Sequence, residues 1–111
     1  MSFPTELLKG TLKPLILALL SEGDKYGYQL IKQLKEKSDA LFDTGEGSIY
    51  PALHALEKKG LLKSYWKPQA EGPDRKYYQL THKGAKELKT AKKEWQTFTQ
   101  AVHKIYGFDV A

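Results

Sequence analysis

The sequence predicts a mainly α-helical fold with a small β-ribbon and one long C-terminal helix. Three observations indicate this class. A short amphipathic run ends at Lys59, two β-like runs flank a turn-rich segment directly after it, and a helical pattern extends from Thr81 to about Tyr106. Helices followed by a ribbon are the element order of a winged helix-turn-helix. We therefore expect a winged helix-turn-helix DNA-binding domain over residues 1–80 and a dimerisation helix over residues 81–111.

The first predicted helix depends on how Pro14 is accommodated. Its apolar stripe has helical spacing and comprises Leu12, Leu15, Ile16, Leu19 and Leu20. A proline in a helix interior disturbs the carbonyl four residues earlier. Either Thr11 is the N-cap and Pro14 lies in the first turn, or a longer helix from about Thr5 kinks at Pro14. We expect the kinked helix, with its end at Gly23.

The second predicted helix spans about Lys25–Lys37, with Asp24 as its N-cap. Aspartate is favoured there because its side chain accepts a hydrogen bond from a free first-turn amide. Gly27 lowers helix stability, so we expect it to mark a close contact between helices. The connection that follows is polar except for Leu41 and Phe42, which we expect to pack onto the core.

The third predicted helix runs from about Ser48 to Lys59, with Ser48 or Gly47 as its N-cap. Pro51 then falls near the first turn, where amides have no intrahelical partner. Gly60 lies where a left-handed C-cap is expected.

This third helix is predicted to have one buried and one exposed face. Its apolar residues recur every three or four positions and are Ile49, Ala52, Leu53 and Leu56. Pro51, His54 and Lys58 project on the opposite face, with Tyr50 on a flank.

Two strands are predicted behind this helix. Leu62–Tyr65 alternates apolar and polar residues, and the run Arg75–Leu80 is rich in aromatic strand formers. The segment from Trp66 to Asp74 contains two prolines and a glycine, so we expect it to form the tip of a wing. Arg75 and Lys76 lie at the base of that tip.

The last predicted helix begins at its N-cap Thr81 and stops at Gly107. Its apolar residues are spaced 3, 4, 3, 4 and 3 apart, which is a heptad seam formed by Leu88, Ala91, Trp95, Phe98, Val102 and Ile105. The seam could pack back on the first helix as ordinary core, or pair with a second subunit. We expect both, with one side on Leu12–Leu20 and the other in a homodimer.

Three motifs occur in a fixed order: Tyr26-Gly27-Tyr28 near the second helix, residues 47–62 through the third helix, and residues 72–84 through the second strand. Together they resemble the PadR family of bacterial transcriptional regulators, over about residues 5–106. Each motif alone is weak, but three at the right spacing are specific. The length is similar to that of the short members, whose C-terminal part is a single helix. Pro14 departs from the family pattern.

A helix that precedes a wing normally enters the major groove, and lysine or arginine at the wing base contacts phosphate. The predicted DNA-binding residues are Ser48, Tyr50, Pro51, His54, Lys58, Lys63, Lys67, Arg75 and Lys76. Tyr50 could donate to a phosphate or pack beneath the helix. Glu71 and Asp74 argue against deep insertion of the tip, because carboxylates repel phosphate.

Aromatic residues suggest two further roles. Tyr65, Trp66, Tyr77 and Tyr78 could form a platform for single-stranded nucleic acid, although strand alternation would place half of them in the core. The family resemblance implies a hydrophobic pore between two subunits, where a flat aromatic effector would stack on Trp95. The predicted ligand-binding residues are Trp95, Thr99, Pro14 and Ala18. The alternative is a filled dimer core, which is the more frequent role of an aromatic stripe.

The composition favours a cytoplasmic binding protein over an enzyme. The chain has 111 residues, a net charge of +5 and no cysteine, so an anionic partner is expected and cysteine chemistry is excluded. Its three histidines lack metal-ligand spacing, and there is no phosphate-binding loop or nucleophile elbow. No cofactor or metal is expected, and no apolar run is long enough to span a membrane.

We therefore expect a homodimeric, ligand-responsive repressor that binds an inverted-repeat duplex. The alternatives are a winged-helix protein-interaction module and a non-specific single-strand binder.

Overall fold

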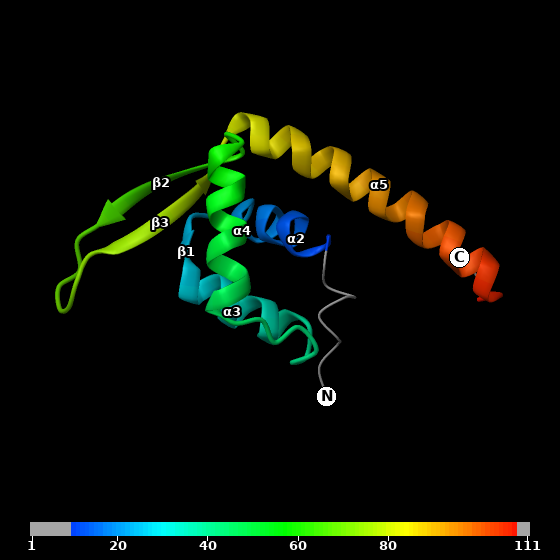
Figure 1. Ribbon diagram of the computed structural model, residues 1–111, viewed down its shortest axis with the longest axis horizontal. Coiled ribbons are helices and arrows are strands. Elements are labelled where there is room, and N and C mark those ends of the chain that lie inside the picture. The colour runs from blue at the N-terminus through cyan, green and yellow to red at the C-terminus, as the bar shows by residue number, and fades with distance from the viewer. Residues whose placement is uncertain (1–9, 109–111) are drawn as a thin grey trace.

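The computed structural model describes residues 10–108 and confirms the predicted fold class. The elements in order are α2 (Leu12–Leu20), β1 (Lys25–Tyr26), α3 (Gly27–Lys37), α4 (Glu46–Lys58), β2 (Leu62–Lys67), β3 (Arg75–Leu80) and α5 (His82–Tyr106). Figure 1 shows α2, α3 and α4 packed together, the sheet extending to one side and α5 to the other. Within residues 10–108, no helix has both the length and the apolar character to cross a membrane.

The core lies where α2, α3 and α4 meet the sheet. Its most deeply buried side chains are branched aliphatic groups from all three helices, namely Ile16, Leu17, Leu30, Ile49 and Leu53. Tyr78 of β3 and Leu88 of α5 complete the same cluster. The three helices are therefore held by one apolar core, to which α5 contributes only near its beginning.

Helix α2 begins at Leu12, so the predicted kinked helix is wrong. Gly10 has a left-handed φ of +86° and lies in a turn with Thr11, so α2 does not continue unbroken from residues before Gly10. Pro14 is instead the third helical residue, where its missing N–H would have no intrahelical acceptor. The predicted start at Thr5 lies outside the described residues.

The sheet has three strands in the order β1-β3-β2, all antiparallel, rather than the two predicted. Lys25 and Tyr26 form β1, so the prediction that a helix starts at Lys25 is wrong. Helix α3 begins at Gly27, and the Tyr26 N–H donates to Gln29 Oε1 at 3.1 Å. Asp24 is not the N-cap, and its Oδ2 accepts a hydrogen bond from the Tyr65 hydroxyl at 2.7 Å.

Helix α4 begins at Glu46, two residues before the predicted Ser48. Gly45 is extended, and its carbonyl accepts the N–H groups of Ser48 and Ile49 at 3.1 Å. Glu46 is favourable in the first turn because the positive end of the helix dipole attracts a carboxylate. Pro51 is consequently the sixth residue of α4, so the expectation that it lies near the first turn is wrong.

Strand β3 has the predicted bounds, and β2 continues two residues past the prediction to Lys67, which pairs with Arg75. The loop at the tip is therefore residues 68–74. We call β2, β3 and this loop the wing.

Hydrogen bonds join the end of α4 to the start of α5. Gly60 has a φ of +77°, and the Leu61 N–H donates to the Leu56 carbonyl at 3.0 Å, which is the pattern of a Schellman cap. Thr81, the predicted N-cap of α5, accepts from the Gly84 N–H at 3.0 Å and donates to the Gly60 carbonyl at 2.7 Å. The Thr81 N–H also donates to the Leu61 carbonyl at 3.1 Å.

Gly84 is required by this junction. A Cβ on Gly84 would lie 2.1 Å from the Leu61 carbonyl oxygen, so Gly84→Ala should lower the free energy of unfolding by about 2–3 kcal/mol. Gly47→Ala is the matched control, because nothing lies within 4 Å of its Cβ position, and it should raise stability by about 0.5–1 kcal/mol. Urea unfolding at one protein concentration measures both, and equal stabilities would contradict the close packing.

Candidate nucleic-acid interface

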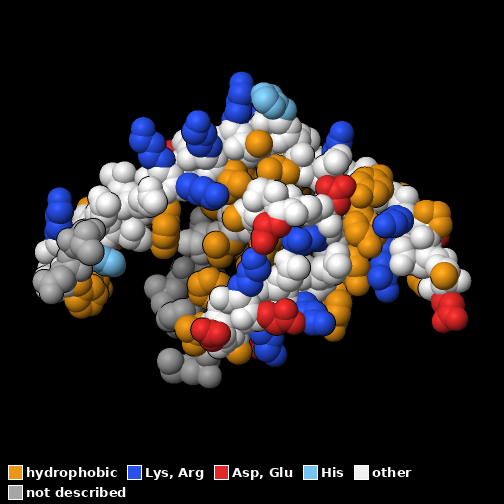
Figure 2. All heavy atoms as spheres, turned by 180° about the vertical axis from the view of Figure 1, so that it is seen from behind, with side chains coloured by type: hydrophobic (Ala, Val, Ile, Leu, Met, Phe, Trp, Pro, Cys, Tyr) orange, Lys and Arg blue, Asp and Glu red, His pale blue; other side chains and the backbone are white. Residues whose placement is uncertain are grey.

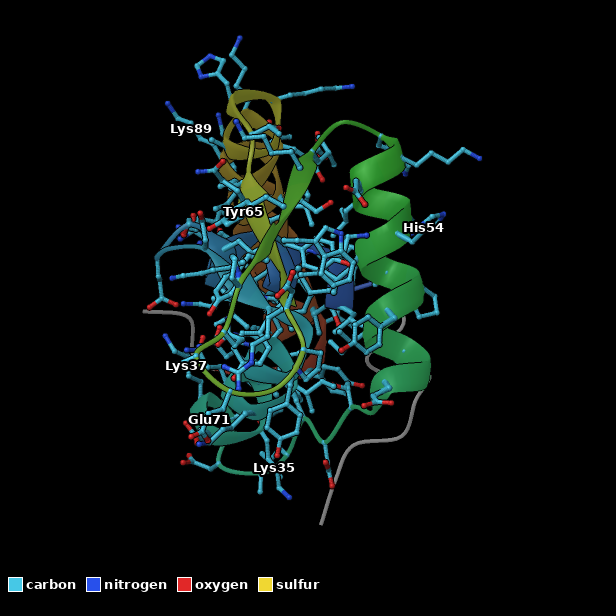
Figure 3. All side chains as sticks on the ribbon, turned by 90° about the vertical axis from the view of Figure 1, so that its left-hand side faces the viewer. Lys35, Lys37, His54, Tyr65, Glu71 and Lys89 are labelled. Carbon is cyan, nitrogen blue, oxygen red and sulfur yellow. The ribbon has the colours of Figure 1, made fainter. Side chains whose placement is uncertain are left out.

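Helix α4 has one buried and one exposed face, as predicted. Ile49, Ala52, Leu53 and Leu56 are buried. The predicted contacts on the other side are all exposed, namely Ser48, Pro51, His54 and Lys58. Figure 3 shows His54 directed away from the rest of the domain. The structure thus brings these four residues together on one accessible helix face.

Tyr50 packs against α3 through Gly27. A Cβ on Gly27 would lie 2.6 Å from the Tyr50 ring, so only glycine leaves room for this contact. The expected close contact at Gly27 is confirmed, and of the two roles considered for Tyr50 the structure supports packing. The residue nevertheless remains 43% exposed, so its hydroxyl as a phosphate donor stays a prediction.

The outer face of the sheet carries cations held against aromatic rings. Tyr65 stacks on Tyr77 at 5.8 Å between centroids, and Tyr26 meets Tyr77 edge-on at 5.4 Å. The Arg75 guanidinium lies 4.5 Å from the Tyr26 ring centroid, and Lys67 Nζ lies 5.2 Å from that of Tyr77. Because these contacts restrict the two side chains, their charges occupy defined positions at the base of the tip loop.

The other predicted wing cations divide between the two faces. Strand alternation places Lys63, which is exposed, on the outer face with Tyr65. Lys76 lies on the inner face, with its Nζ 3.9 Å from Glu57 Oε1 of α4. Glu57 also accepts a hydrogen bond from the Ser64 hydroxyl. The charge of Lys76 is therefore partly balanced within the protein, whereas Arg75 has no such ion pair within residues 10–108.

The four aromatic residues of the wing do not form one stacking platform. Tyr78 is buried in the core, whereas Tyr65 and Trp66 are 40% and 64% exposed. Tyr65 and Tyr77 share the outer face and cover each other, while Trp66 points to the opposite side of its strand. A continuous surface for stacking successive bases is absent from this sheet.

The acidic tip of the wing is displaced from the exposed face of α4. Glu71 and Asp74 are exposed. In Figure 3, Glu71 lies on the opposite side of the molecule from His54. A phosphate near His54 would therefore not face the Glu71 carboxylate directly.

Sequence reasoning missed Tyr26 and the role of Asp24. Strand β1 is only two residues long, too short for a period-2 pattern, and Asp24 matched an N-cap signature. The Asp24–Tyr65 hydrogen bond raises the pKa of the Tyr65 hydroxyl above its ordinary value. This bond joins the turn before β1 to the middle of the wing.

Half of the predicted heptad seam is exposed along α5. Leu88 is buried and Ala91 is half-buried, where the helix contacts α2. Further along, Val102 is half-buried, but Trp95, Phe98 and Ile105 are 54%, 60% and 88% exposed. The packing of the seam on the first helix is thus confirmed only for its beginning.

A groove of about 800 Å³ separates α2 from α5. Three of the four predicted ligand-binding residues line it, namely Pro14, Ala18 and Trp95. Thr99 is not among the lining residues, and its hydroxyl donates to the Trp95 carbonyl at 2.9 Å. Figure 2 shows hydrophobic side chains along the inner side of the α5 arm and lysines on its outer side.

The described part of the chain offers no metal centre. Within residues 10–108, no group of three or more His, Asp or Glu side chains is placed to hold a metal ion. The geometry favours binding through exposed cations and apolar grooves.

Comparison with known proteins agrees with this geometry. The sequence profile of the Transcriptional regulator PadR-like family matches residues 16–90, from α2 into α5. A solved transcriptional regulator from Clostridium thermocellum is 35% identical with a TM-score of 0.83, over 89% of this chain and 96% of that chain. A PadR family transcription regulator from hypervirulent Clostridium difficile is 38% identical with a TM-score of 0.75, over 87% and 98%.

One curated relative extends the comparison to a named regulator. The Negative transcriptional regulator PadR of Bacillus subtilis is 32% identical over 77 residues, which is 69% of this chain. The match covers 42% of that protein, so the present chain spans less than half of its length.

The Asp24–Tyr65 contact can be tested by titration. Asp24→Asn should lower the pKa of Tyr65 toward its ordinary value, because a phenolate no longer forms beside a carboxylate. Carbon NMR of the Tyr65 ring measures this, with Asp39→Asn as a control on an exposed carboxylate elsewhere. Since the folded-state pKa is raised, the contribution of the pair to stability is present below the unfolded-state pKa and lost as pH rises through the folded-state pKa. An unchanged Tyr65 pKa in Asp24→Asn would contradict the contact.

Proposed function

The chain belongs to the Transcriptional regulator PadR-like family, and from this premise we propose that it is a homodimeric repressor that binds duplex DNA through α4 and the wing. The family consists of transcriptional regulators rather than enzymes. The observation that supports the DNA contact is the division of α4, with its apolar residues buried and Ser48, Pro51, His54 and Lys58 exposed together. In this proposal the exposed face of α4 enters the major groove.

In this proposal the wing supplies phosphate contacts. Arg75 and Lys67 are held against tyrosine rings on the outer sheet face, and Lys63 is exposed on the same face, four residues earlier on β2. Such contacts fix the position of the protein on the duplex without reading its sequence. The net charge of +5 favours approach to a polyanion. Lys76 is the weakest of the proposed contacts because Glu57 lies close to its charge.

The exposed seam of α5 supports the homodimer. Trp95, Phe98 and Ile105 form an apolar row that residues 10–108 of one chain leave open. A second copy would cover this row through a two-fold contact, because each helix presents the same surface to the other. We therefore propose residues 1–80 as the DNA-binding domain and residues 81–111 as the dimerisation helix. Two reading helices about 34 Å apart would then require an inverted-repeat site.

Repression and a response to an effector complete the proposal. The Bacillus subtilis relative is named a negative regulator. The groove of about 800 Å³ beside Trp95 has the size and apolar lining of a small-molecule site. A flat hydrophobic molecule there would stack on Trp95, with Pro14 and Ala18 as its wall. If the second subunit fills the groove instead, Trp95 is part of the dimer core.

The reading role of α4 predicts a specific pair of losses. The test uses a duplex that the protein retains from fragments of its own genome. His54→Ala should weaken binding to this duplex about tenfold or more and relax the sequence preference of the protein, because a base contact is lost. Lys58→Ala should flatten the dependence of log affinity on log salt by about one unit, because one phosphate contact is lost. Lys89→Ala on α5 is the control, since it removes the same charge from another exposed surface.

Fluorescence anisotropy over a salt series measures these changes. Wild-type affinity in both α4 variants would exclude this helix as the reader. Equal binding of the wild type to any acidic polymer would favour a winged-helix protein-interaction module. A preference for single strands would favour a non-specific single-strand binder.

Trp95→Ala distinguishes a filled dimer core from an open pore. In a filled core, truncation should cost about 3–5 kcal/mol and shift the dimer toward monomer or unfolded chain. In an open pore, the dimer should survive and only the fluorescence response to flat hydrophobic ligands should disappear. Trp66→Ala is the matched control, because Trp66 lies on β2 and is 64% exposed. Sedimentation decides the first point, and a wild type that stays monomeric at about tens of micromolar would contradict the dimer.

A further inference from the structure

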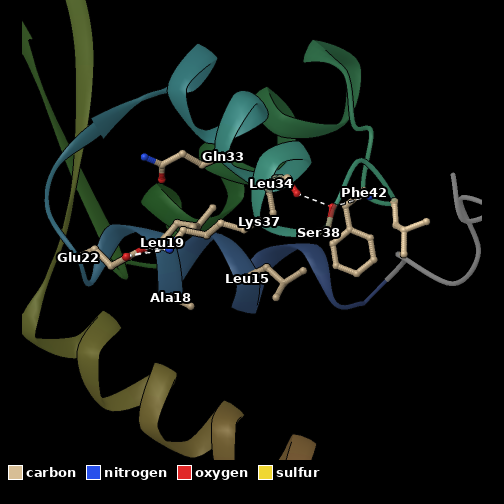
Figure 4. A pocket seen from close by; sticks show the side chains of 10 residues that line it. Leu15, Ala18, Leu19, Glu22, Gln33, Leu34, Lys37, Ser38 and Phe42 are labelled. Carbon is tan, nitrogen blue, oxygen red and sulfur yellow. Dashed lines mark hydrogen bonds and ion pairs between the residues drawn. The ribbon is translucent and has the colours of Figure 1, made fainter. Parts of the chain in front are cut away.

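A second cavity lies on the other side of α2. It has a volume of about 420 Å³ and opens between α2, α3 and the connection from α3 to α4 (Figure 4). Most of its wall is apolar, including Leu19, Leu34 and Leu41. The volume falls in the range of small-molecule sites.

One polar atom in this wall lacks a partner. Gln33 Oε1 is buried, and no donor within residues 10–108 reaches it. Figure 4 shows the Gln33 oxygen directed toward the space between α3 and α2. A buried acceptor without a hydrogen bond is unfavourable, so this atom would gain from a donor inside the cavity.

The charges at the rim are already paired. Lys37 Nζ donates to both Glu22 carboxylate oxygens, at 2.9 and 3.0 Å, which joins α3 to the turn after α2. The remaining polar rim group, the Ser38 hydroxyl, donates to the Leu34 carbonyl at 2.6 Å and accepts from the Phe42 N–H at 2.8 Å. The cavity therefore favours a neutral occupant over an ion.

The floor of the cavity is connected to the reading helix. Leu41 and Phe42 belong to the short connection that leads to Gly45, the N-cap of α4. Asp39 and Ala40 in this connection have left-handed φ values of 54° and 66°, a conformation that is costly for residues other than glycine. Thr44 Oγ1, next to the N-cap, is also buried without a partner in the described part of the chain.

We propose that this cavity binds a small neutral molecule with an apolar body and a single N–H or O–H donor directed at Gln33. An occupant would rest against Leu41 and Phe42 and so alter the position of the connection before α4. Since α4 is the proposed reading helix, the occupant should also change the affinity for duplex DNA. This regulatory part of the proposal rests on the proposed function. The site is separate from the groove beside Trp95, although Leu15, Ala18 and Phe42 line both.

Indole and benzofuran form a matched pair of probes, because they differ in the N–H donor and share a flat bicyclic shape. Indole should shift the backbone amide NMR signals of Gln33, Lys37 and Leu41, which line this cavity and not the groove beside Trp95. Benzofuran should bind about tenfold more weakly, the usual net value of one hydrogen bond.

Gln33→Leu keeps the side chain's approximate size and removes the acceptor, so it should reduce indole affinity to that of benzofuran. Gln69→Leu, on the wing loop, is the control and should leave indole affinity unchanged. If Gln33→Leu fails to fold, the two probes on the wild type still decide. Equal affinities for indole and benzofuran would overturn the site. Shifts confined to the amides of Ala91, Trp95 and Phe98 would also overturn it.

The effect of an occupant on duplex affinity is measured separately. Indole at saturation should change duplex affinity in the wild type and not in Gln33→Leu. An unchanged wild-type affinity would overturn the coupling to α4. A ligand-free wild type that binds no duplex would overturn the proposed function and, with it, the coupling, while the NMR result would still decide whether the site exists.

Discussion

The Leu61 carbonyl is the point on which the arrangement of the helices and the sheet depends. The Thr81 N–H donates to it, and Gly84 packs so closely against it that a side chain would collide. The same few residues end α4, begin β2, end β3 and begin α5. Because these four element ends meet at one hydrogen-bonded junction, the directions of the candidate reading helix, the wing and the α5 arm are set together. The additional hydrogen bond from Lys83 Nζ to the Lys59 carbonyl, at 2.9 Å, reinforces the junction.

The two halves of the candidate interface are stiffened in different ways. Helix α4 is fixed by its buried face and by the contact of Tyr50 with Gly27, so its exposed side chains extend from a rigid rod. The wing is fixed by its ring contacts and by the Asp24–Tyr65 hydrogen bond, which brace its base and leave the loop 68–74 without such supports among the contacts described. Rigid cations lose less freedom on binding than unrestrained lysines, which favours Arg75 over Lys63 as an ordered contact.

Sequence patterns were sufficient wherever local chemistry and packing agree. The faces of α4, the bounds of β3, the Gly60 cap and the extent of α5 follow from apolar spacing and from glycine or threonine caps. The errors before α3 occurred where a distant partner overrides a local preference, whereas the starts of α2 and α4 were misplaced by local turn and cap residues. Asp24 has the chemistry of an N-cap, but the Tyr65 hydroxyl is its partner, and Lys25–Tyr26 pairs with β3 rather than joining α3. The cavity beside Gln33 could not be predicted, because an unpaired amide oxygen is a property of packing and has no sequence signature.

Helix α2 lies between the groove beside Trp95 and the cavity beside Gln33. Leu15 and Ala18 line both the groove toward α5 and the cavity toward α3, so one helix separates two apolar spaces. Phe42 also lines both and belongs to the connection that precedes α4. An occupant of either space would therefore press on residues that also border the other. Because packed interiors transmit displacement rather than absorb it, this shared wall is a physical route by which changes beside α5 could reach the start of the reading helix.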